Sequence, residues 1–197
     1  PLKKEGHGEF YYLFLFALCG GMFMASSADL ITLYVGLEVL SLSSYVLAGL
    51  RKQHIKSNEA AFKYLILGGT ASAVFLFGAS YAYGLTGTTH LMTMGQRLGE
   101  AMQDGMTFFV VLAFVMMLGG LGFKVSLAPF HMWAPDVYEG AHTPVTTFLS
   151  IVSKTAAFAL MYRILVSIFI LYMTSEMVLA LGTVLAVVAG FSMIVGN

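Results

Sequence analysis

Three ionisable side chains, Glu38, Lys124 and Lys154, each lie within a run of apolar residues. A charge at the centre of a bilayer costs at least about 2.5–3.5 kcal/mol, so such residues are usually paired or functional. A lysine that an acidic neighbour stabilises and that desolvation destabilises can exchange its proton near neutral pH. These three residues are therefore the candidates for a proton relay, with Glu38 paired to Lys124.

The alternative for Glu38 and Lys124 is a static ion pair that only joins two helices. Because hydrophobic replacements of a buried ion pair often stabilise a fold equally well, we favour the relay. Lys154 lies too deep in its apolar stretch to reach the interface. The nearest acidic residues all lie outside that stretch: Asp136, Glu139 and Glu176. Lys154 therefore needs a partner on another helix, or water.

Other polar residues of the apolar stretches are weaker candidates. Lys63 is either a relay residue or a lysine that snorkels to the interface, and for Arg163 we favour snorkelling. His131 is a possible relay residue, with a hydrogen-bonded structural histidine as the alternative. Hydroxyl groups that would support a water chain, or would only pack helices together, belong to Ser41, Ser44, Tyr45, Ser153 and Thr155.

A metal site is not expected from this sequence. Residues of metal-ligating types, His131, Asp136, Glu139 and His142, lie in a short window that contains one Glu-x-x-His spacing. Di-metal helix bundles carry this spacing twice, on regular helices, whereas here Gly140 and Pro144 disturb it. The single cysteine, Cys19, excludes a disulfide framework and a thiolate cluster. The sequence also contains no glycine-rich phosphate loop and no nucleophile elbow.

The composition places these residues in a membrane protein. The chain has 197 residues, of which 58% are hydrophobic and only 10% charged. Soluble domains contain about 25% charged residues, so a water-soluble globule is excluded and the lipid bilayer is the expected environment. Ten basic residues balance ten acidic ones, so the charge gives no argument for a nucleic-acid partner.

Six stretches are apolar over roughly the 20 residues that a transmembrane helix needs. They cover residues 10–28, 30–50, 60–85, 106–125, 145–171 and 177–195, and Ser26 to Asp29 form a helix start signal before the second. Between Ser126 and Pro144 the chain is apolar but interrupted by prolines and a glycine, which predicts a discontinuous continuation of the fourth helix. We expect an all-α membrane protein with about six transmembrane helices, one discontinuous, in a single domain over residues 1–197.

Basic residues indicate how the chain is oriented. Lys3 and Lys4 precede the first stretch, and the loop at 51–59 carries Arg51, Lys52 and Lys56. The positive-inside rule predicts that both segments are cytoplasmic, and that the polar loop from Thr86 to Gly105 lies outside. Because the chain starts without Met and stops after an apolar run, we expect it to be an excerpt of a longer protein.

Two motifs make a specific resemblance. The segment from Tyr34 to Leu42, YVGLEVLSL, resembles the acid-bearing helix of the antiporter-like subunits of respiratory complex I. The segment from Gly120 to Gly140, GLGFKVSLAPFHMWAPDVYEG, is similar to the subunit N family of NADH-quinone oxidoreductases, and the match continues through Phe148 to Thr155. Other antiporter-like subunits tend to differ after the Trp-x-Pro-Asp step. The resemblance covers essentially the whole chain.

The resemblance implies a fold of two inverted five-helix repeats, each with a discontinuous helix. This chain would hold the first repeat and the opening helix of the second. Glu38 matches the family's glutamate, Lys124 its partner lysine on the broken helix, and Lys154 the central lysine that passes protons laterally. His131 falls on a family histidine. His142 departs from the pattern, because relatives often have a non-ionisable residue there.

The resemblance also implies a function: a non-redox, proton-translocating subunit of a bacterial NADH:quinone oxidoreductase in the cell (inner) membrane. We expect no cofactor in this chain, flavin and iron–sulfur clusters in partner subunits, and ubiquinone or menaquinone bound elsewhere in the complex. One alternative is a subunit of a multisubunit cation/proton antiporter. The other is a structural scaffold subunit whose buried charges only fix helix geometry.

Overall fold

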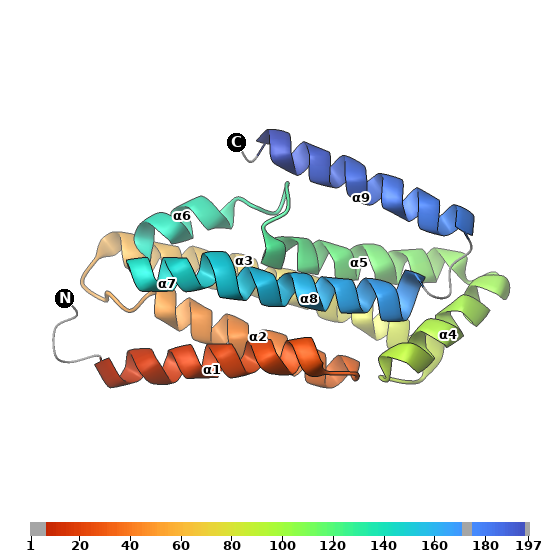
Figure 1. Cartoon of the computed structure of the whole chain (residues 1–197), viewed down its shortest axis with the longest axis horizontal. Helices are drawn as coiled ribbons and strands as arrows, with labels where there is room; N and C mark the ends of the chain where they lie inside the picture. The colour runs from red at the N-terminus through yellow and green to blue at the C-terminus, as the bar shows by residue number, and fades with distance from the viewer. Residues whose placement is uncertain (1–6, 171–174, 196–197) are drawn as a thin grey trace.

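The computed structural model describes residues 7–170 and 175–195, and within these ranges the protein is helical, with a lone β-bridge between Asp29 and His90 and no strand. This confirms the all-α prediction. Figure 1 shows long helices lying side by side along one axis. The helices are α1 (His7–Ser26), α2 (Leu30–Ala48), α3 (Ile55–Thr86), α4 (Leu91–Gln103), α5 (Thr107–Val125), α6 (Trp133–Gly140), α7 (Thr143–Phe148), α8 (Lys154–Ile164) and α9 (Ser175–Val195), with π-helical turns η1 (Leu149–Ser153) and η2 (Leu165–Phe169) on either side of α8.

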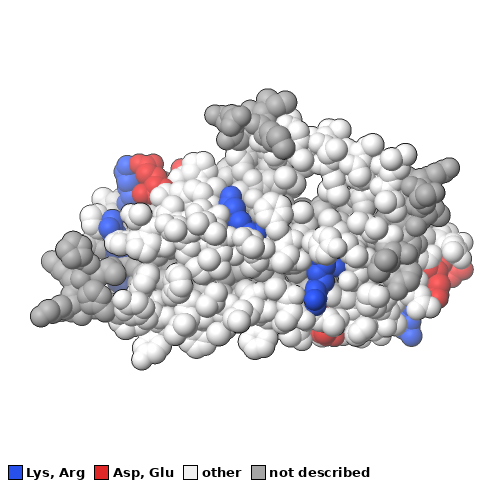
Figure 2. All heavy atoms as spheres, in the orientation of Figure 1, with Lys and Arg blue, Asp and Glu red and all other residues white. Residues whose placement is uncertain are grey.

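Five helical segments of the described chain are long and apolar enough to cross a membrane: Gly8–Ser26, Leu30–Ala48, Ile55–Thr86, Thr107–Val125 and Thr143–Phe169. In α9, the sixth predicted span, the apolar part found is shorter, Leu181–Ser192. Figure 2 shows charged side chains at both ends of the long axis, and between them a largely white face with isolated blue side chains. The chain is therefore a multi-pass membrane protein. The predicted cytoplasmic residues Lys3 and Lys4, and Leu171, lie outside the described residues.

The predicted helix start at Asp29 is confirmed. The Asp29 carboxylate accepts hydrogen bonds from the backbone N–H groups of Ile31 (2.9 Å) and Thr32 (3.2 Å), which caps α2. The Thr89 hydroxyl also donates to Asp29, and this bond, more than the backbone bonds, lowers the pKa of the carboxyl. The backbone N–H of Leu30 also donates to the carbonyl of Thr89 at 2.8 Å, and that of Leu91 to the carbonyl of Ala28 at 3.0 Å. The α1–α2 corner and the α3–α4 connection are thereby joined at one end of the molecule.

Two segments that we predicted as loops are helical. Helix α3 begins at Ile55, so the second half of the 51–59 loop belongs to it. The segment from Thr86 to Gly105 contains α4, which buries Leu91, Met94, Gly95 and Leu98 on one face. This spacing is an amphipathic helix pattern, and the helix is too polar overall to qualify as a membrane span. Figure 1 shows α4 at one end of the bundle, at an angle to the long helices.

The predicted discontinuity after the fourth span is confirmed. Helix α5 ends at Val125, because Ser126 adopts a left-handed conformation with φ 58°. Residues 127–132 form no regular helix, α6 follows, and Ala141 is extended before α7 begins. Pro144 stands in the first turn of α7, where a missing N–H is tolerated. The chain therefore has irregular backbone directly beyond Lys124.

Close backbone contact joins α1 to α2, the helix that carries Glu38. A Cβ atom on Gly36 would lie 2.7 Å from the backbone nitrogen of Met24 and 2.9 Å from the carbonyl oxygen of Gly20. Only hydrogen fits at this crossing, as at many helix crossings in membranes. The core lies between these helices and α3, α5 and α6, with fully or nearly fully buried Leu33, Leu37, Phe75, Met117, Leu121 and Trp133.

Candidate functional site

Lys124 lies in the last turn of α5 and reaches across to α2. Its Nζ donates to the Ser41 hydroxyl at 2.6 Å and lies 3.4 Å from the Tyr45 hydroxyl. The same Nζ lies 5.7 Å from the centre of the Tyr45 ring. The C-terminal end of a helix favours a positive charge, so α5 itself contributes to this site. The half-buried ammonium group is therefore held by neutral hydroxyl groups and an aromatic ring.

Glu38 lies one helical turn before Ser41 on α2. Its Oε1 is buried and has no hydrogen-bond partner in the described chain, and the ion pairs found there do not include Glu38 with Lys124. The predicted pairing of these two residues is thus not formed in this arrangement, in which Lys124 contacts the next polar residue along α2. The Ser41 hydroxyl donates its own hydrogen to the carbonyl of Leu37 at 2.6 Å, so it meets Lys124 as an acceptor.

Ser44 has a different role from Ser41. Its hydroxyl is fully buried and donates to the carbonyl of Leu40 at 2.6 Å, within its own helix. Of the hydroxyl groups that the sequence offers for a water chain, Ser41 and Tyr45 contact a candidate lysine. Ser44 and Thr155 bond to carbonyls of their own helices.

A series of aromatic side chains runs from the Lys124 site towards Lys154. Tyr45 packs edge-on against Tyr64 with ring centres 4.7 Å apart, and Tyr64 stacks on Trp133 at 4.5 Å. Trp133 meets Tyr138 edge-on at 6.1 Å. The indole N–H of Trp133 donates to the carbonyl of Phe123, the residue before Lys124, at 2.9 Å. We call Tyr45, Tyr64, Trp133 and Tyr138 the aromatic series.

Lys154 follows the π-helical turn η1 directly and lies near the middle of the span Thr143–Phe169. Single π-helical turns within α-helices often occur at functional sites. The side chain is half-buried, and its Nζ lies 5.7 Å from the centre of the Tyr138 ring. The sequence leaves a partner on another helix or water as the possibilities for Lys154, and in the described chain the neighbour on another element is an aromatic ring.

The remaining predicted residues fall outside the two lysine sites. His131 lies in the irregular segment, and its Nδ1 is buried without a hydrogen-bond partner in the described residues, as is Nδ1 of His142. Burial also lowers the pKa of His142. Lys63 pairs with Asp136 at 2.6 Å and with Glu59 at 2.7 Å.

The acidic residues of the window considered for metal binding are used in ion pairs. Asp136 pairs with Lys63, and Glu139 pairs with Lys56. In the described part of the chain, no three His, Cys, Asp or Glu side chains come together as metal ligands would. These ion pairs instead join α6 to the first turns of α3.

Arg163, for which we expected snorkelling, binds the end of another helix. Its guanidinium donates to the carbonyl oxygens of Ser26, at 2.9 Å, and Ser27. A cation at a helix C-terminus satisfies carbonyl groups that lack helical partners. Arg163 therefore ties α8 to the last turn of α1.

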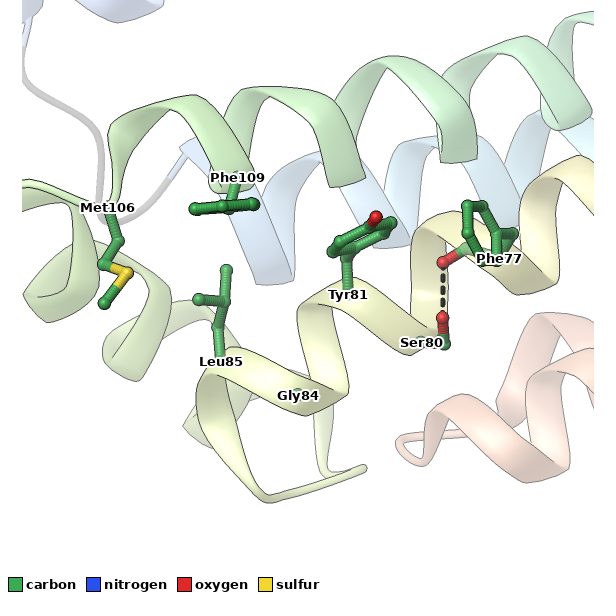
Figure 3. A pocket seen from close by; sticks show the side chains of 7 residues that line it. All are labelled: Phe77, Ser80, Tyr81, Gly84, Leu85, Met106 and Phe109. Atoms are coloured by element: carbon green, nitrogen blue, oxygen red, sulfur yellow. Dashed lines mark hydrogen bonds between the residues drawn. The ribbon is translucent and has the colours of Figure 1, made fainter.

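A shallow surface pocket of about 340 Å³ lies between the end of α3 and the start of α5 (Figure 3). Its wall is apolar except for two hydroxyl-bearing residues, and the Ser80 hydroxyl donates to the carbonyl of Phe77 at 2.7 Å. None of the predicted relay residues lines it. The residues that do are Phe77, Ser80, Tyr81, Gly84, Leu85, Met106 and Phe109.

Comparisons with known proteins agree with the resemblance in the motifs. Residues 27–197 match the family model described as "NADH:quinone oxidoreductase/Mrp antiporter, TM". The chain is 51% identical over 202 residues to NADH-quinone oxidoreductase subunit N of Geobacillus sp. (strain WCH70), covering 98% of this chain and 41% of that protein. The chain thus spans about two fifths of that relative's length.

Solved structures of multisubunit membrane complexes contain a similar fold. Respiratory complex I from Thermus thermophilus with bound aureothin contains a chain that matches with a TM-score of 0.71 and 42% identity, over 82% of this chain and 35% of that one. The Mrp complex from Dietzia sp. DQ12-45-1b contains one that matches with a TM-score of 0.67 and 27% identity, over 80% of this chain and 29% of that one.

Proposed function

Because this chain belongs to the NADH:quinone oxidoreductase/Mrp antiporter transmembrane family, we propose that the whole protein is a proton-translocating membrane subunit of a bacterial NADH-quinone oxidoreductase. Protons move through Glu38, Lys124 and Lys154 in the cell (inner) membrane, with residues 51–54 on the cytoplasmic side. Partner membrane subunits complete the complex. Flavin, iron–sulfur clusters and quinone belong to those partners, so this chain performs no redox step.

The observation that carries the proposal is the setting of Lys124. Its ammonium group stands where α5 ends and lies against Ser41 and Tyr45, one turn along α2 from the buried carboxylate of Glu38. Charge at bilayer depth costs at least about 2.5–3.5 kcal/mol. A hydrogen bond to a charged group returns about 1.5–3 kcal/mol, and a desolvated cation–π contact about 2 kcal/mol. These opposing contributions nearly cancel, so a small movement is enough to change the proton occupancy of Lys124.

The mechanism follows from two acceptors of different charge on one face of α2. When Lys124 Nζ pairs with the Glu38 carboxylate, the opposite charge holds the proton on the lysine. When Nζ lies against the neutral Ser41 hydroxyl, that hold is weaker, and the proton passes through water to the uncharged amine of Lys154. Lys124 is then reprotonated from the hydrated region beside the irregular segment. A conformational or charge change in a partner subunit drives the exchange between the two positions.

The two alternatives are a subunit of a cation/proton antiporter and a structural scaffold subunit. The similarity to the Mrp complex of Dietzia favours, as the second candidate, a subunit of a multisubunit cation/proton antiporter. Identity is higher to subunit N, 51% against 27%, which is why we place NADH-quinone oxidoreductase first. Transport that depends on sodium and proceeds without NADH oxidation in isolated vesicles would support the antiporter instead.

The deciding experiment is the substitution Lys124→Ala in the full-length protein within its assembled complex. We expect normal assembly on a native gel and a collapse of proton pumping and coupled NADH oxidation, measured together in inside-out membrane vesicles. Lys52→Ala, at an exposed lysine in the loop after α2, is the matched control and should pump normally. If Lys124→Ala pumps at the wild-type rate, Lys124 is a packing residue and the proposed mechanism is wrong, even if the family is right.

A further inference from the structure

Lys154 is a predicted relay residue whose ammonium group lacks a polar partner among the described residues. Neither a hydrogen bond nor an ion pair of its Nζ is found within residues 7–170 and 175–195, although the side chain is half-buried. The contact that its ammonium group does make is with the ring of Tyr138, at 5.7 Å from the ring centre. The negative face of an aromatic ring attracts a cation at this range, and more strongly where water is excluded.

Tyr138 is well placed to hold a cation because its own position is fixed from several sides. The Thr146 hydroxyl donates to the backbone carbonyl of Tyr138 at 3.3 Å, and Trp133 packs edge-on against the Tyr138 ring. Two ion pairs, Lys56–Glu139 and Lys63–Asp136, join the surrounding helix α6 to α3. The ring is thus attached to the rest of the bundle independently of Lys154.

The aromatic series connects the Lys154 site with the Lys124 site. Tyr45, at one end of the series, contacts Lys124, and Tyr138, at the other end, contacts Lys154. The rings between them are buried Tyr64 and Trp133. A continuous series of ring contacts, two edge-on and one stacked, therefore links the surroundings of the two lysines.

We propose that Tyr138 is a positioning residue of the relay, whose ring face seats the protonated side chain of Lys154 at the middle of the membrane. This inference rests on the proposed function. The geometry assigns the role to the ring and not to the hydroxyl group. The Tyr138 hydroxyl is buried and has no hydrogen-bond partner among the described residues, whereas the ring lies directly beside the ammonium group.

Two substitutions separate the ring from the hydroxyl. Tyr138→Phe keeps the aromatic face and should retain most of the coupled proton pumping. Tyr138→Leu removes the face and should lower pumping roughly tenfold, the factor expected for losing a partly desolvated cation–π contact. Tyr162→Leu is the matched control, because Tyr162 lies on the same helix as Lys154 but is 70% exposed. Loss of pumping in Tyr138→Phe, or normal pumping in Tyr138→Leu, would overturn the assignment to the ring.

A double variant distinguishes an effect through Lys154 from a general defect in packing. All variants are made in the full-length protein, with assembly of the complex checked on a native gel. If Tyr138 acts through Lys154, adding Tyr138→Leu to Lys154→Ala should lower pumping no further. An additional loss in the double variant would mean that Tyr138 is only a packing residue. If Lys154→Ala alone pumps normally, the relay itself fails, whereas a defect in Lys154→Ala without one in Tyr138→Leu refutes this inference alone.

Discussion

At the scale of single residues, Ser41 decides where Lys124 rests. Its hydroxyl accepts a 2.6 Å hydrogen bond from Lys124 and donates to the Leu37 carbonyl. These two bonds together fix the orientation of the hydroxyl group. Ser41→Ala removes an acceptor from a charged donor, a loss of about 1.5–3 kcal/mol where no group replaces it. We expect Ser41→Ala to lower the rate of coupled proton pumping about tenfold, because Lys124 loses the neutral acceptor beside which it releases its proton. The rate is measured in membrane vesicles that carry normal amounts of the complex.

Ser44→Ala is the control for this prediction. It removes an equally buried hydroxyl from the same helix, but one that bonds only to Leu40 of its own helix. Pumping should stay within about twofold of wild type, since a bond inside the helix contributes to stability and not to the position of Lys124. Equal effects of the two substitutions would show that the serines act only through α2 stability.

Asp29 gives a pH-dependent prediction at the same scale. The bond from Thr89 and those from the backbone of α2 lower the pKa of this carboxyl below its ordinary value. A lowered pKa in the folded state means that the charge stabilises the fold above the usual carboxyl pKa, and that this stabilisation disappears as the pH falls through the lowered pKa. Asp29→Ala should therefore cost about 1 kcal/mol at neutral pH and less in acid.

The measurement is thermal unfolding of the purified protein in detergent, compared between about pH 7 and pH 3, a range that brackets ordinary carboxyl pKa values. Asp29→Asn serves as the control, because asparagine caps a helix as well as aspartate does but carries no charge. It should keep most of the stability at neutral pH. If the difference in stability between wild type and Asp29→Ala grows in acid, the pKa of Asp29 is not lowered in the folded protein.

The sequence predicts some of these residues but not their partners. Glu38, Lys124 and Lys154 are identifiable because a charge inside an apolar stretch is rare and costly. Tyr138 could not be assigned in the same way, since an aromatic residue in an apolar segment is ordinary and its contact with Lys154 depends on how α6 folds back. The position of Lys124 beside Ser41, one turn from Glu38, depends likewise on the relative height of α2 and α5.

At the scale of elements, the crossing of α1 and α2 sets the position of Glu38. Gly36 lies two residues before Glu38 and contacts the backbone of α1 at Gly20 and Met24. A methyl group at Gly36 forces the two helices apart, because the atoms that it meets are backbone atoms that cannot rotate away. We expect Gly36→Ala to cost about 1–3 kcal/mol, the usual range for overpacking, and to reduce coupled pumping.

Thermal unfolding and vesicle pumping assays test this prediction together. Gly69→Ala is the matched control, because a Cβ atom at Gly69 of α3 meets nothing within 4 Å. That substitution should leave stability unchanged or slightly raised, since alanine favours a helix more than glycine does. If Gly36→Ala behaves like Gly69→Ala, the α1–α2 crossing has room to spare and does not position Glu38.

The five long apolar segments could be located from the sequence because continuous hydrophobicity is a strong local signal. The break after Val125 was equally predictable from its prolines and glycine. A search for continuous hydrophobicity does not find the start of α3, which is polar, or α4, whose signal is the amphipathic spacing of a few apolar residues. In the fold, α4 buries Leu91, Met94 and Leu98 against the bundle.

At the scale of the whole molecule, the two ends of the bundle differ in charge. The α2–α3 connection and the start of α3 carry Arg51, Lys52 and Lys56. The α3–α5 connection carries one basic residue, Arg97, with Glu100 and Asp104. Helix α3 has 32 residues and is roughly 48 Å long, more than the thickness of the hydrocarbon core, so we expect these connections to emerge on opposite sides of the membrane.

Cysteine labelling of the full-length protein in bacterial membranes tests this orientation. Gln53 and Gln103 are exposed and lie in the two connections, so each is replaced by cysteine in a Cys19→Ser background. Since the positive-inside rule places the more basic connection in the cytoplasm, a membrane-impermeant thiol reagent should label Gln53→Cys only in inside-out vesicles. Gln103→Cys should react only in right-side-out vesicles. Labelling of both cysteines from the same side would mean that α3 does not span the bilayer. If instead Gln53→Cys reacts only in right-side-out vesicles and Gln103→Cys only in inside-out ones, the break beyond Lys124 lies nearer the other surface. The side from which protons enter would then be reversed.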